Sequence, residues 1–375
     1  MGENEVLCEV SECGTGRDVY AQHTYGKWIQ MTVKVGIINV TSYSGSELVR
    51  LLHSHNGVSI ECVTGRSAAG KRLSEVFPHL ASVDMVIEPE VGESIDVAFS
   101  ALPHKASAEV VIPLLDAGIK VVDISADFRL KDPNDYKTWY GGEHLAPHLL
   151  ETAVYGLTEI HRREIGLASL VANPGCYPTG AILALAPAVK EGLIEADIVI
   201  DSKSGVSGAG RSLGLDYHFS EANDNLKAYS IDGHRHLPEI SQELAMVAGS
   251  KVNVTFLPHL VPLTRGILSS CYALLNESMF PDVDKAKTKI VDAYREFYKD
   301  EQFVHVVNEP PQTKQTWGSN MCYIYPTVDV RTGRLIVVSC LDNLVKGAAG
   351  QAIQNMNVMC QMPESEGLES LAVYP

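Results

Sequence analysis

The chain has 375 residues, of which 45% are hydrophobic and 20% are charged. This length suggests about two domains, and the composition is that of a folded globular enzyme rather than of a disordered chain. The formal net charge of −16 argues against nucleic acid and anionic membranes as partners, and any anionic substrate must therefore meet a local cluster of Arg or Lys.

The eight cysteines are scattered and include no CxxC pair, which favours reduced cytoplasmic thiols over a disulfide framework or a zinc site. No apolar run approaches the roughly 18 residues of a membrane span, and no signal-peptide core is present. We therefore expect a cytoplasmic protein with no membrane partner. Residues 1–31 are polar and are interpreted as an N-terminal extension of unknown role, with an internal start at Met31 as the alternative.

Short apolar runs and segments with helical spacing alternate from residue 33 to residue 172. Strands are predicted over 33–38, 58–63, 95–100, 119–124 and 168–172, and helices over 46–53 and 105–117. This alternation with short connections is typical of a parallel, doubly wound sheet, so the first half of the chain is predicted to be an α/β domain.

The turn after the first strand is rich in small residues and precedes a helix, an arrangement whose free amides bind phosphate. The usual dinucleotide fingerprint has three glycines, whereas here Asn39 and Ser42 occupy the first two positions and only Gly45 remains. Asn tolerates left-handed backbone angles and Ser is small, so a dinucleotide turn remains compatible with the sequence. The alternative is an ordinary strand-to-helix turn.

The loop after the second strand carries Arg66, with Lys71 and Arg72 behind it, and residues 62–72 contain no acidic residue. An acidic residue there would hold the ribose 2′-hydroxyl of NAD, whereas Arg suits the 2′-phosphate of NADP. If a dinucleotide binds, the sequence predicts NADP(H). The alternative is a solvated basic loop.

Cys176 is the cysteine with the most distinctive surroundings. Pro174 and Gly175 interrupt the strand before it, and a helical run begins at about Gly180. Free amides and the helix dipole at such a turn favour a thiolate, so Cys176 is the predicted nucleophile. The alternative is a buried, inert cysteine.

After Cys176 the strands are longer. They are predicted over 197–201, 251–256 and 268–275, with a hairpin over 320–340 and helices over 283–298 and 344–359. We expect a mixed or antiparallel sheet in this half, and a last helix that packs back on the first domain.

His236 and Glu239 lie three residues apart at the start of another predicted helix, where Pro238 suits the first turn. The carboxylate is close enough to orient the imidazole, and an oriented histidine supplies the proton transfer that thiol chemistry requires. His234 and His236 also form a possible metal pair, but no third ligand is nearby and no metal is predicted. A pair of surface or capping histidines is the remaining alternative.

Two segments are candidates for binding an acidic substrate. Ser125 and Arg129 follow a predicted parallel strand, at the edge where open α/β sheets bind ligands. Arg211 ends the glycine-rich loop 204–211, which suits a phosphate or a carboxylate. Such loops are also often simple turns.

These segments together resemble the N-acetyl-γ-glutamyl-phosphate reductases, the arginine-pathway branch of the semialdehyde dehydrogenase superfamily. The resemblance covers residues 32–360 in the family's order. The matching runs are TSYSGSEL (41–48), ALPH (101–104), ISADFR (124–129), NPGCYPT (173–179), GHRHLPEI (233–240) and DNLVKGAAGQ (342–351).

The resemblance implies an NADP-binding Rossmann domain, residues 32–175 and 341–375, and an α+β catalytic and oligomerisation domain, residues 176–340. It implies Cys176 as nucleophile and His236 as acid/base, with Glu239 in support, in a homodimer or homotetramer. The residues expected to contact NADP(H) are Ser42, Tyr43, Ser44, Gly45, Thr64, Gly65, Arg66 and Asn343.

The implied reaction is NADPH-dependent reduction of N-acetyl-γ-glutamyl phosphate to the semialdehyde, with phosphate release, through a Cys176 thioester. One alternative is the related reductase of an aminoadipyl or glutamyl phosphate attached to a small acidic carrier, which a chain at −16 would repel. A second alternative is a non-catalytic NADP-binding redox sensor that uses Cys176.

Overall fold

The computed structural model describes residues 23–24, 27–28, 32–92, 94–280, 282 and 285–375. The chain forms a short N-terminal unit, residues 1–32, and a second unit from Val33 to Pro375. In the first unit the structure describes one antiparallel pair, β1 (His23–Thr24) with β2 (Lys27–Trp28). The rest of the predicted extension, 1–31, lies outside the described residues.

A seven-stranded parallel sheet forms the first half of the large unit, in the order β5-β4-β3-β6-β7-β9-β8. Its strands are β3 (Val33–Ile38), β4 (Val58–Thr64), β5 (Ile87–Glu88), β6 (Val97–Ser100), β7 (Lys120–Asp123), β8 (Val154–Tyr155) and β9 (Leu170–Ala172). The chain runs from β3 through β4 to β5 on one side, and then from β6 to β7 on the other, where β8 forms the edge and β9 lies between β7 and β8. The carboxyl ends of β3 and β6 therefore border the crevice where such sheets bind ligands.

Helices cover both faces of the parallel sheet, as the alternating sequence predicts. They are α1 (Tyr43–Leu52), α2 (Leu73–Val76), α3 (Ser107–Asp116), α4 (Pro133–Tyr140), α5 (Pro147–Thr152) and α6 (Thr158–Ile165). Leu48 of α1 packs in one buried core with Ile37 of β3. Val111 of α3 packs in another with Val121 of β7.

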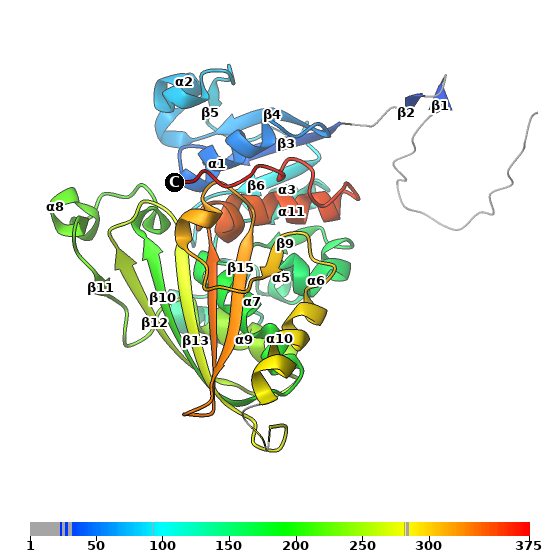
Figure 1. Cartoon of the computed structure of the whole chain (residues 1–375). Coiled ribbons are helices and arrows are strands. Elements are labelled where there is room, and N and C mark those ends of the chain that lie inside the picture. Colours follow the sequence, from blue (N-terminus) through cyan, green and yellow to red (C-terminus); the bar gives the residue numbers. More distant parts are fainter. Residues whose placement is uncertain (1–22, 25–26, 29–31, 93, 281, 283–284) are drawn as a thin grey trace, which may run out of the picture. The chain divides into compact units, whose positions relative to one another are not determined.

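A second seven-stranded sheet is mixed, in the order β11-β12-β10-β13-β16-β15-β14 (Figure 1). Its strands are β10 (Ile194–Gly205), β11 (Lys227–Ala228), β12 (Asn253–Val261), β13 (Ile267–Leu275), β14 (Val304–Val306), β15 (Cys322–Asp329) and β16 (Arg334–Leu341). β10 pairs parallel with β12 and antiparallel with β13, and β15 and β16 form the predicted hairpin.

Helices α7 (Cys176–Lys190), α9 (Leu237–Ala248) and α10 (Ala286–Phe297) lie along one face of the mixed sheet (Figure 1). The short helix α8 (Phe219–Ala222) lies in the excursion between β10 and β11. Short 3₁₀ turns cover 66–68, 78–80, 206–209, 215–217 and 313–316.

The chain returns to the parallel sheet at its C-terminal end. A π-helical turn, Val345–Ala349, leads into α11 (Gly350–Met359), whose Ile353 and Met356 join the core of α1 and β3. The last helix therefore packs on the first half, as predicted, although its first turn is π-helical.

Two helices begin earlier than the sequence predicts. α1 starts at Tyr43 rather than Ser46, because the Ser42 hydroxyl caps it by accepting a hydrogen bond from the Gly45 amide. α7 starts at Cys176 itself rather than at Gly180. Cys176 therefore lies in the first helical turn.

Candidate active site

The turn that carries Cys176 joins β9 to α7. Asn173 continues the strand, with its amide donating to the Asp123 carbonyl, and Gly175 is extended at the N-cap of α7. The Gly175 carbonyl then accepts from both the amide and the hydroxyl of Thr179. These bonds fix the turn at both ends, so that Cys176 begins the helix at the edge of the parallel sheet.

A buried carboxylate holds this turn from the opposite side. Glu239, in the first turn of α9, accepts from the Gly175 amide at 2.8 Å and from the Tyr155 hydroxyl at 2.7 Å. Its other oxygen lies 3.3 Å from Nη1 of Arg129. Within the described residues no hydrogen bond joins Glu239 to His236. The carboxylate contacts the turn that carries Cys176, and the predicted support of the imidazole by Glu239 has no direct hydrogen bond behind it in this part of the chain.

His236 meets the Cys176 turn across Gly175. A Cβ placed on Gly175 would lie 2.5 Å from Nε2 of His236 and 2.9 Å from Nη1 of Arg129. Burial, with the neighbouring His234 and Arg129, holds the pKa of His236 well below its ordinary value. The imidazole is therefore neutral near pH 7 and able to accept a proton. Its buried Nδ1 has no hydrogen-bond partner among the described residues.

The Cys176 thiol is less acidic than its helix position predicts. Burial raises its pKa to about 11, although Arg129 and the Tyr177 amide act in the opposite direction. This direction is opposite to the one that the helix start predicts, because burial is the largest influence on the pKa of the thiol. Forming the nucleophile then requires a nearby proton acceptor, and His236 is the neutral base that lines the same cavity.

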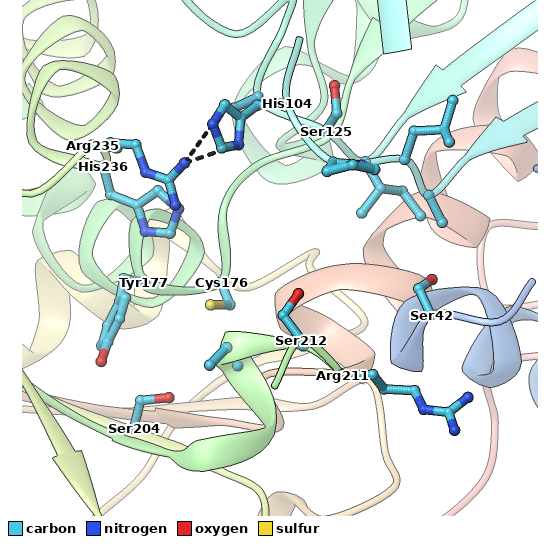
Figure 2. A pocket seen from close by; sticks show the side chains of 18 of the residues that line it. Ser42, His104, Ser125, Cys176, Tyr177, Ser204, Arg211, Ser212, Arg235 and His236 are labelled. Carbon is cyan, nitrogen blue, oxygen red and sulfur yellow. Dashed lines mark hydrogen bonds between the residues drawn. The ribbon is translucent and has the colours of Figure 1, made fainter. Parts of the chain in front are cut away.

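A cavity of about 650 Å³ opens in front of Cys176 (Figure 2). Ser125 and Arg211, two of the predicted substrate residues, line it together with Cys176 and His236. A smaller adjoining cavity of about 210 Å³ is lined by Cys176 and His236 as well, and also by Ser42, Tyr43, Ser44, Arg129 and Asn343. Cys176, His236 and the predicted dinucleotide turn thus line adjoining cavities.

The three predicted substrate residues differ in burial and in the number of hydrogen bonds that they already make. The Ser125 hydroxyl donates to Asp123 and accepts from the Asp127 amide. Arg129 is buried and donates to the carbonyls of Ile124 and Asn173 as well as contacting Glu239. Both therefore brace the loop and the Cys176 turn within the described structure.

Arg211 is exposed, and it contacts the dinucleotide side of the cavity. Its Nη1 donates to the Thr41 carbonyl at 2.9 Å, and its guanidinium lies over the Phe77 ring. Figure 2 shows it beside Ser42, away from His104 and Arg235. The arginine is thus placed near the turn expected to bind the cofactor's phosphates.

The turn after β3 has the geometry that a dinucleotide turn needs without its usual glycines. Asn39 adopts a left-handed φ of 63°, and its side-chain amide donates to the Ala101 carbonyl. Gly45 is tightly enclosed, because a Cβ there would lie 2.5 Å from the Asn39 carbonyl oxygen. α1 can therefore approach β3 closely and direct its free first-turn amides at a ligand.

Two further cofactor candidates border this space. Thr64, Gly65 and Arg66 line a cavity of about 530 Å³, which shares Asn39 and Leu102 with the main cavity. Asn343 is buried, and its side chain donates to the Ser207 hydroxyl and accepts from the Gly266 amide. The adjoining cavities, together with the close approach of α1 to β3 at Gly45, fit an extended dinucleotide whose phosphates lie near α1.

Some residues of the main cavity escape prediction from the sequence. They include His104, Tyr177, Ser204, Tyr229, His234 and Arg235. His104 has a usable signal, since it follows β6 at the carboxyl edge of the parallel sheet. Tyr177, His234 and Arg235 adjoin the predicted Cys176 and His236 in the sequence, whereas Ser204 and Tyr229 come from other segments. Among the described residues, no group of three His, Cys, Asp or Glu side chains is placed to hold a metal ion.

Comparison with known proteins identifies the family. Residues 34–168 match the model of the semialdehyde dehydrogenase NAD binding domain, and residues 176–343 match that of the semialdehyde dehydrogenase dimerisation domain. The chain is 56% identical to the N-acetyl-γ-glutamyl-phosphate reductase of Dehalococcoides mccartyi, over 91% of this chain and 99% of the relative. The chain belongs to the N-acetyl-γ-glutamyl-phosphate reductase family. The resemblance predicted from the sequence is confirmed.

Other relatives support the same family and fold. The reductase of Geotalea daltonii is 51% identical over 92% of this chain and all of the relative. An aspartate semialdehyde dehydrogenase of Candida albicans, solved with NADP, matches with a TM-score of 0.67 at 18% identity, covering 88% of this chain and 98% of that one. The dehydrogenase II of Vibrio cholerae also gives a TM-score of 0.67, at 14% identity, covering 88% and 99%. These structures confirm the predicted α/β fold class. In the described part of the chain, no helix has the length and apolar character needed to cross a membrane.

Proposed function

We propose that this chain catalyses the NADPH-dependent reduction of N-acetyl-γ-glutamyl phosphate to N-acetylglutamate semialdehyde, with release of phosphate, in arginine biosynthesis. The observation that carries the proposal is that Cys176 and His236 line the same two cavities, one of which also borders the dinucleotide turn, while His236 packs against Gly175, the residue before Cys176. Relatives that are 51–56% identical to this chain carry the name of this reaction.

Cys176 is the proposed nucleophile. Its Sγ attacks the acyl carbon while His236 accepts the thiol proton, and phosphate leaves as the thioester forms. NADPH, when bound, supplies a hydride for the thioester carbonyl. His236 then returns a proton as the aldehyde leaves and the Cys176 thiol is restored. The thioester is useful because its carbonyl accepts hydride far more readily than a carboxylate does.

The residues proposed to hold the cofactor surround the connected cavities. The first turn of α1 would offer the amides of Tyr43 and Ser44 to the pyrophosphate, since those of Ser42 and Gly45 already donate within the turn, and the Thr64–Arg66 loop would bind the adenosine end. Arg66 is exposed, and residues 62–72 lack the acidic side chain that an NAD site uses, which favours a 2′-phosphate and hence NADP(H). Asn343 borders the space beside Cys176.

We further propose that residues 32–175 and 341–375 act as the cofactor domain and residues 176–340 as the catalytic and oligomerisation domain. The return of α11 to the core of α1 and β3 supports this division. A homodimer or homotetramer fits the match to a dimerisation domain. The six cysteines among the described residues are free thiols, which supports a cytoplasmic location.

The reverse reaction tests the proposal. Purified protein with N-acetylglutamate semialdehyde, inorganic phosphate and NADP⁺ should produce NADPH only when phosphate is present, faster than with NAD⁺. Cys176→Ser should lower the rate at least about 1,000-fold while the circular dichroism spectrum is unchanged. Near-normal turnover of that variant would contradict the mechanism.

A second set of assays separates this reaction from the two alternatives, a carrier-dependent reductase and a non-catalytic redox sensor. Turnover of a carrier-bound acyl phosphate in preference to the free substrate would assign the chain to the carrier-dependent reductases. Binding of NADP with oxidation of Cys176, but without any phosphate-dependent turnover, would favour the redox sensor.

A further inference from the structure

Arg235 is a cation of the main cavity that forms no ion pair with the acidic groups the structure describes. It lies between His234 and His236, directly before α9, and lines the cavity of about 650 Å³. Its Nη1 lies 2.9 Å from Nδ1 and 3.0 Å from Nε2 of His104 (Figure 2). Within the described residues Arg235 has no ion pair with Asp or Glu.

The partner of Arg235 is an uncharged side chain. Burial and the adjacent Arg235 both lower the pKa of His104. A guanidinium has only donors, so the bond requires an unprotonated ring nitrogen on His104. His104 thus holds the arginine in the cavity without cancelling its charge.

The charge of the main cavity differs from that of the protein as a whole. The net charge is −16, yet none of the described residues that line the main cavity is Asp or Glu. The other two arginines near Cys176 have different surroundings, since Arg129 is buried against Glu239 and Arg211 lies against Thr41. Arg235 is therefore the arginine positioned to meet a negative charge on the His236 side of the nucleophile.

We propose that Arg235 is a specificity-determining residue that binds an anionic group of the substrate, either its phosphate or its carboxylate, and that His104 holds the guanidinium ready for it. The inference rests on the proposed function for the identity of the substrate. A phosphate or carboxylate accepts two charge-assisted bonds from the guanidinium fork, which are stronger than the bond to a neutral imidazole. The incoming anion therefore replaces His104 as partner, while Arg211 stays on the dinucleotide side.

The reverse reaction separates the two possible anions because phosphate and semialdehyde are then distinct substrates. Arg235→Gln should raise the KM for one of them at least tenfold and leave the KM for NADP⁺ within twofold of the wild type. A raised KM for phosphate assigns the phosphate, and a raised KM for the semialdehyde assigns the carboxylate. Arg235→Lys, which keeps the charge and loses the fork, should be intermediate.

The matched control is Arg163→Gln, which removes an exposed arginine on α6 outside the cavity. It should leave every KM unchanged. If Arg235→Gln also leaves the KM values for phosphate and semialdehyde within twofold of the wild type, Arg235 binds neither anion and the proposal is overturned.

A binding measurement tests the anion site at Arg235 independently of the proposed reaction. Inorganic phosphate and N-acetylglutamate are added as probes while iodoacetamide labels Cys176, and the labelled peptide is quantified by mass spectrometry. One of the probes should slow labelling of the wild type, and Arg235→Gln should need at least tenfold more of it for half protection. If the wild type shows this protection but has no turnover, the proposed reaction is refuted while the anion site at Arg235 is supported. Equal protection of wild type and variant, or protection of neither, would refute the anion site.

Discussion

At the scale of single residues, Gly175 allows His236 to pack closely against the turn that carries Cys176. Its φ of −68° is open to any residue, so the requirement for glycine is one of space rather than of backbone conformation. A methyl group there would approach His236 Nε2 to 2.5 Å, well inside contact distance. The residue beside the nucleophile therefore determines how closely the imidazole can approach it.

Gly175→Ala should reduce kcat about 100-fold, because displacing a catalytic group by about 1 Å has that order of effect. The protein should still fold, and a steady-state assay beside thermal denaturation measures both properties. Gly92→Ala is the control, since no heavy atom lies within 4 Å of a Cβ there. Unchanged kcat in Gly175→Ala would mean that His236 is not required at this position.

The raised pKa of Cys176 gives a pH dependence that is testable in the substrate-free protein. The thiolate is the reactive species, and burial raises the pKa of the thiol to about 11. Alkylation of Cys176 by iodoacetamide should therefore accelerate about tenfold per pH unit between about pH 7 and 9, without a plateau below about pH 10. A plateau below pH 8 would show that Arg129 and the helix amides outweigh burial.

At the scale of elements, the π-helical turn Val345–Ala349 links Cys176 to a buried ion pair. Gly347 packs against Cys176, since a Cβ on it would lie 2.8 Å from the cysteine Cβ. Lys346, beside it, donates to Glu159 of α6 at 2.6 Å and to Gln354 of α11 at 2.7 Å. Both charged side chains are fully buried. One short turn thus fixes the position of α11 and encloses Cys176.

Lys346→Met should lower the free energy of unfolding by about 3–5 kcal/mol, because it leaves the Glu159 carboxylate buried without its cation. Chemical denaturation monitored by fluorescence measures the change. The matched control Lys299→Met breaks an exposed pair with Glu296 and should cost about 0.5 kcal/mol or less. Equal losses in the two variants would show that burial of the ion pair has no energetic consequence.

At the scale of the whole molecule, the mixed sheet has one face covered by α7, α9 and α10, and another whose apolar side chains stay partly exposed in the single chain. Val338 of β16 lies on that second face, opposite Tyr325 of β15 and Ser270 of β13. Val199 of β10 is 39% exposed. Because the same segment matches a dimerisation domain, we infer that a second copy of the chain covers this face.

Val338→Arg should shift the protein toward the monomer, since it places an unpaired charge in the middle of the inferred contact. Size-exclusion chromatography with light scattering at several protein concentrations measures the mass. Arg334→Ala, at the exposed start of the same strand, serves as the control. An unchanged oligomer in Val338→Arg would locate the subunit contact elsewhere.

The sequence predicts most of the elements, because period and turn chemistry are local properties. The strand before Cys176 and the β15–β16 hairpin are predicted to within a few residues, whereas α4, α5, β8 and α6 are not predicted. Asn39 adopts the left-handed conformation that its residue type tolerates. Helix starts are less accurate, because the Ser42 cap acts through one side-chain bond that periodicity does not reveal.

What the sequence determined by itself is the fold class, the family and Cys176 as the predicted nucleophile, since short runs of neighbouring residues carry those signals. Only the tertiary structure decided the hydrogen-bond partners of the site residues. Glu239 accepts from the Gly175 amide rather than contacting His236, and Arg235 hydrogen-bonds to His104 from a distant element. It also decided that burial raises the pKa of Cys176. The physical reason is that charge and desolvation depend on groups brought together across the two sheets, and residue spacing along the chain carries no record of those distances.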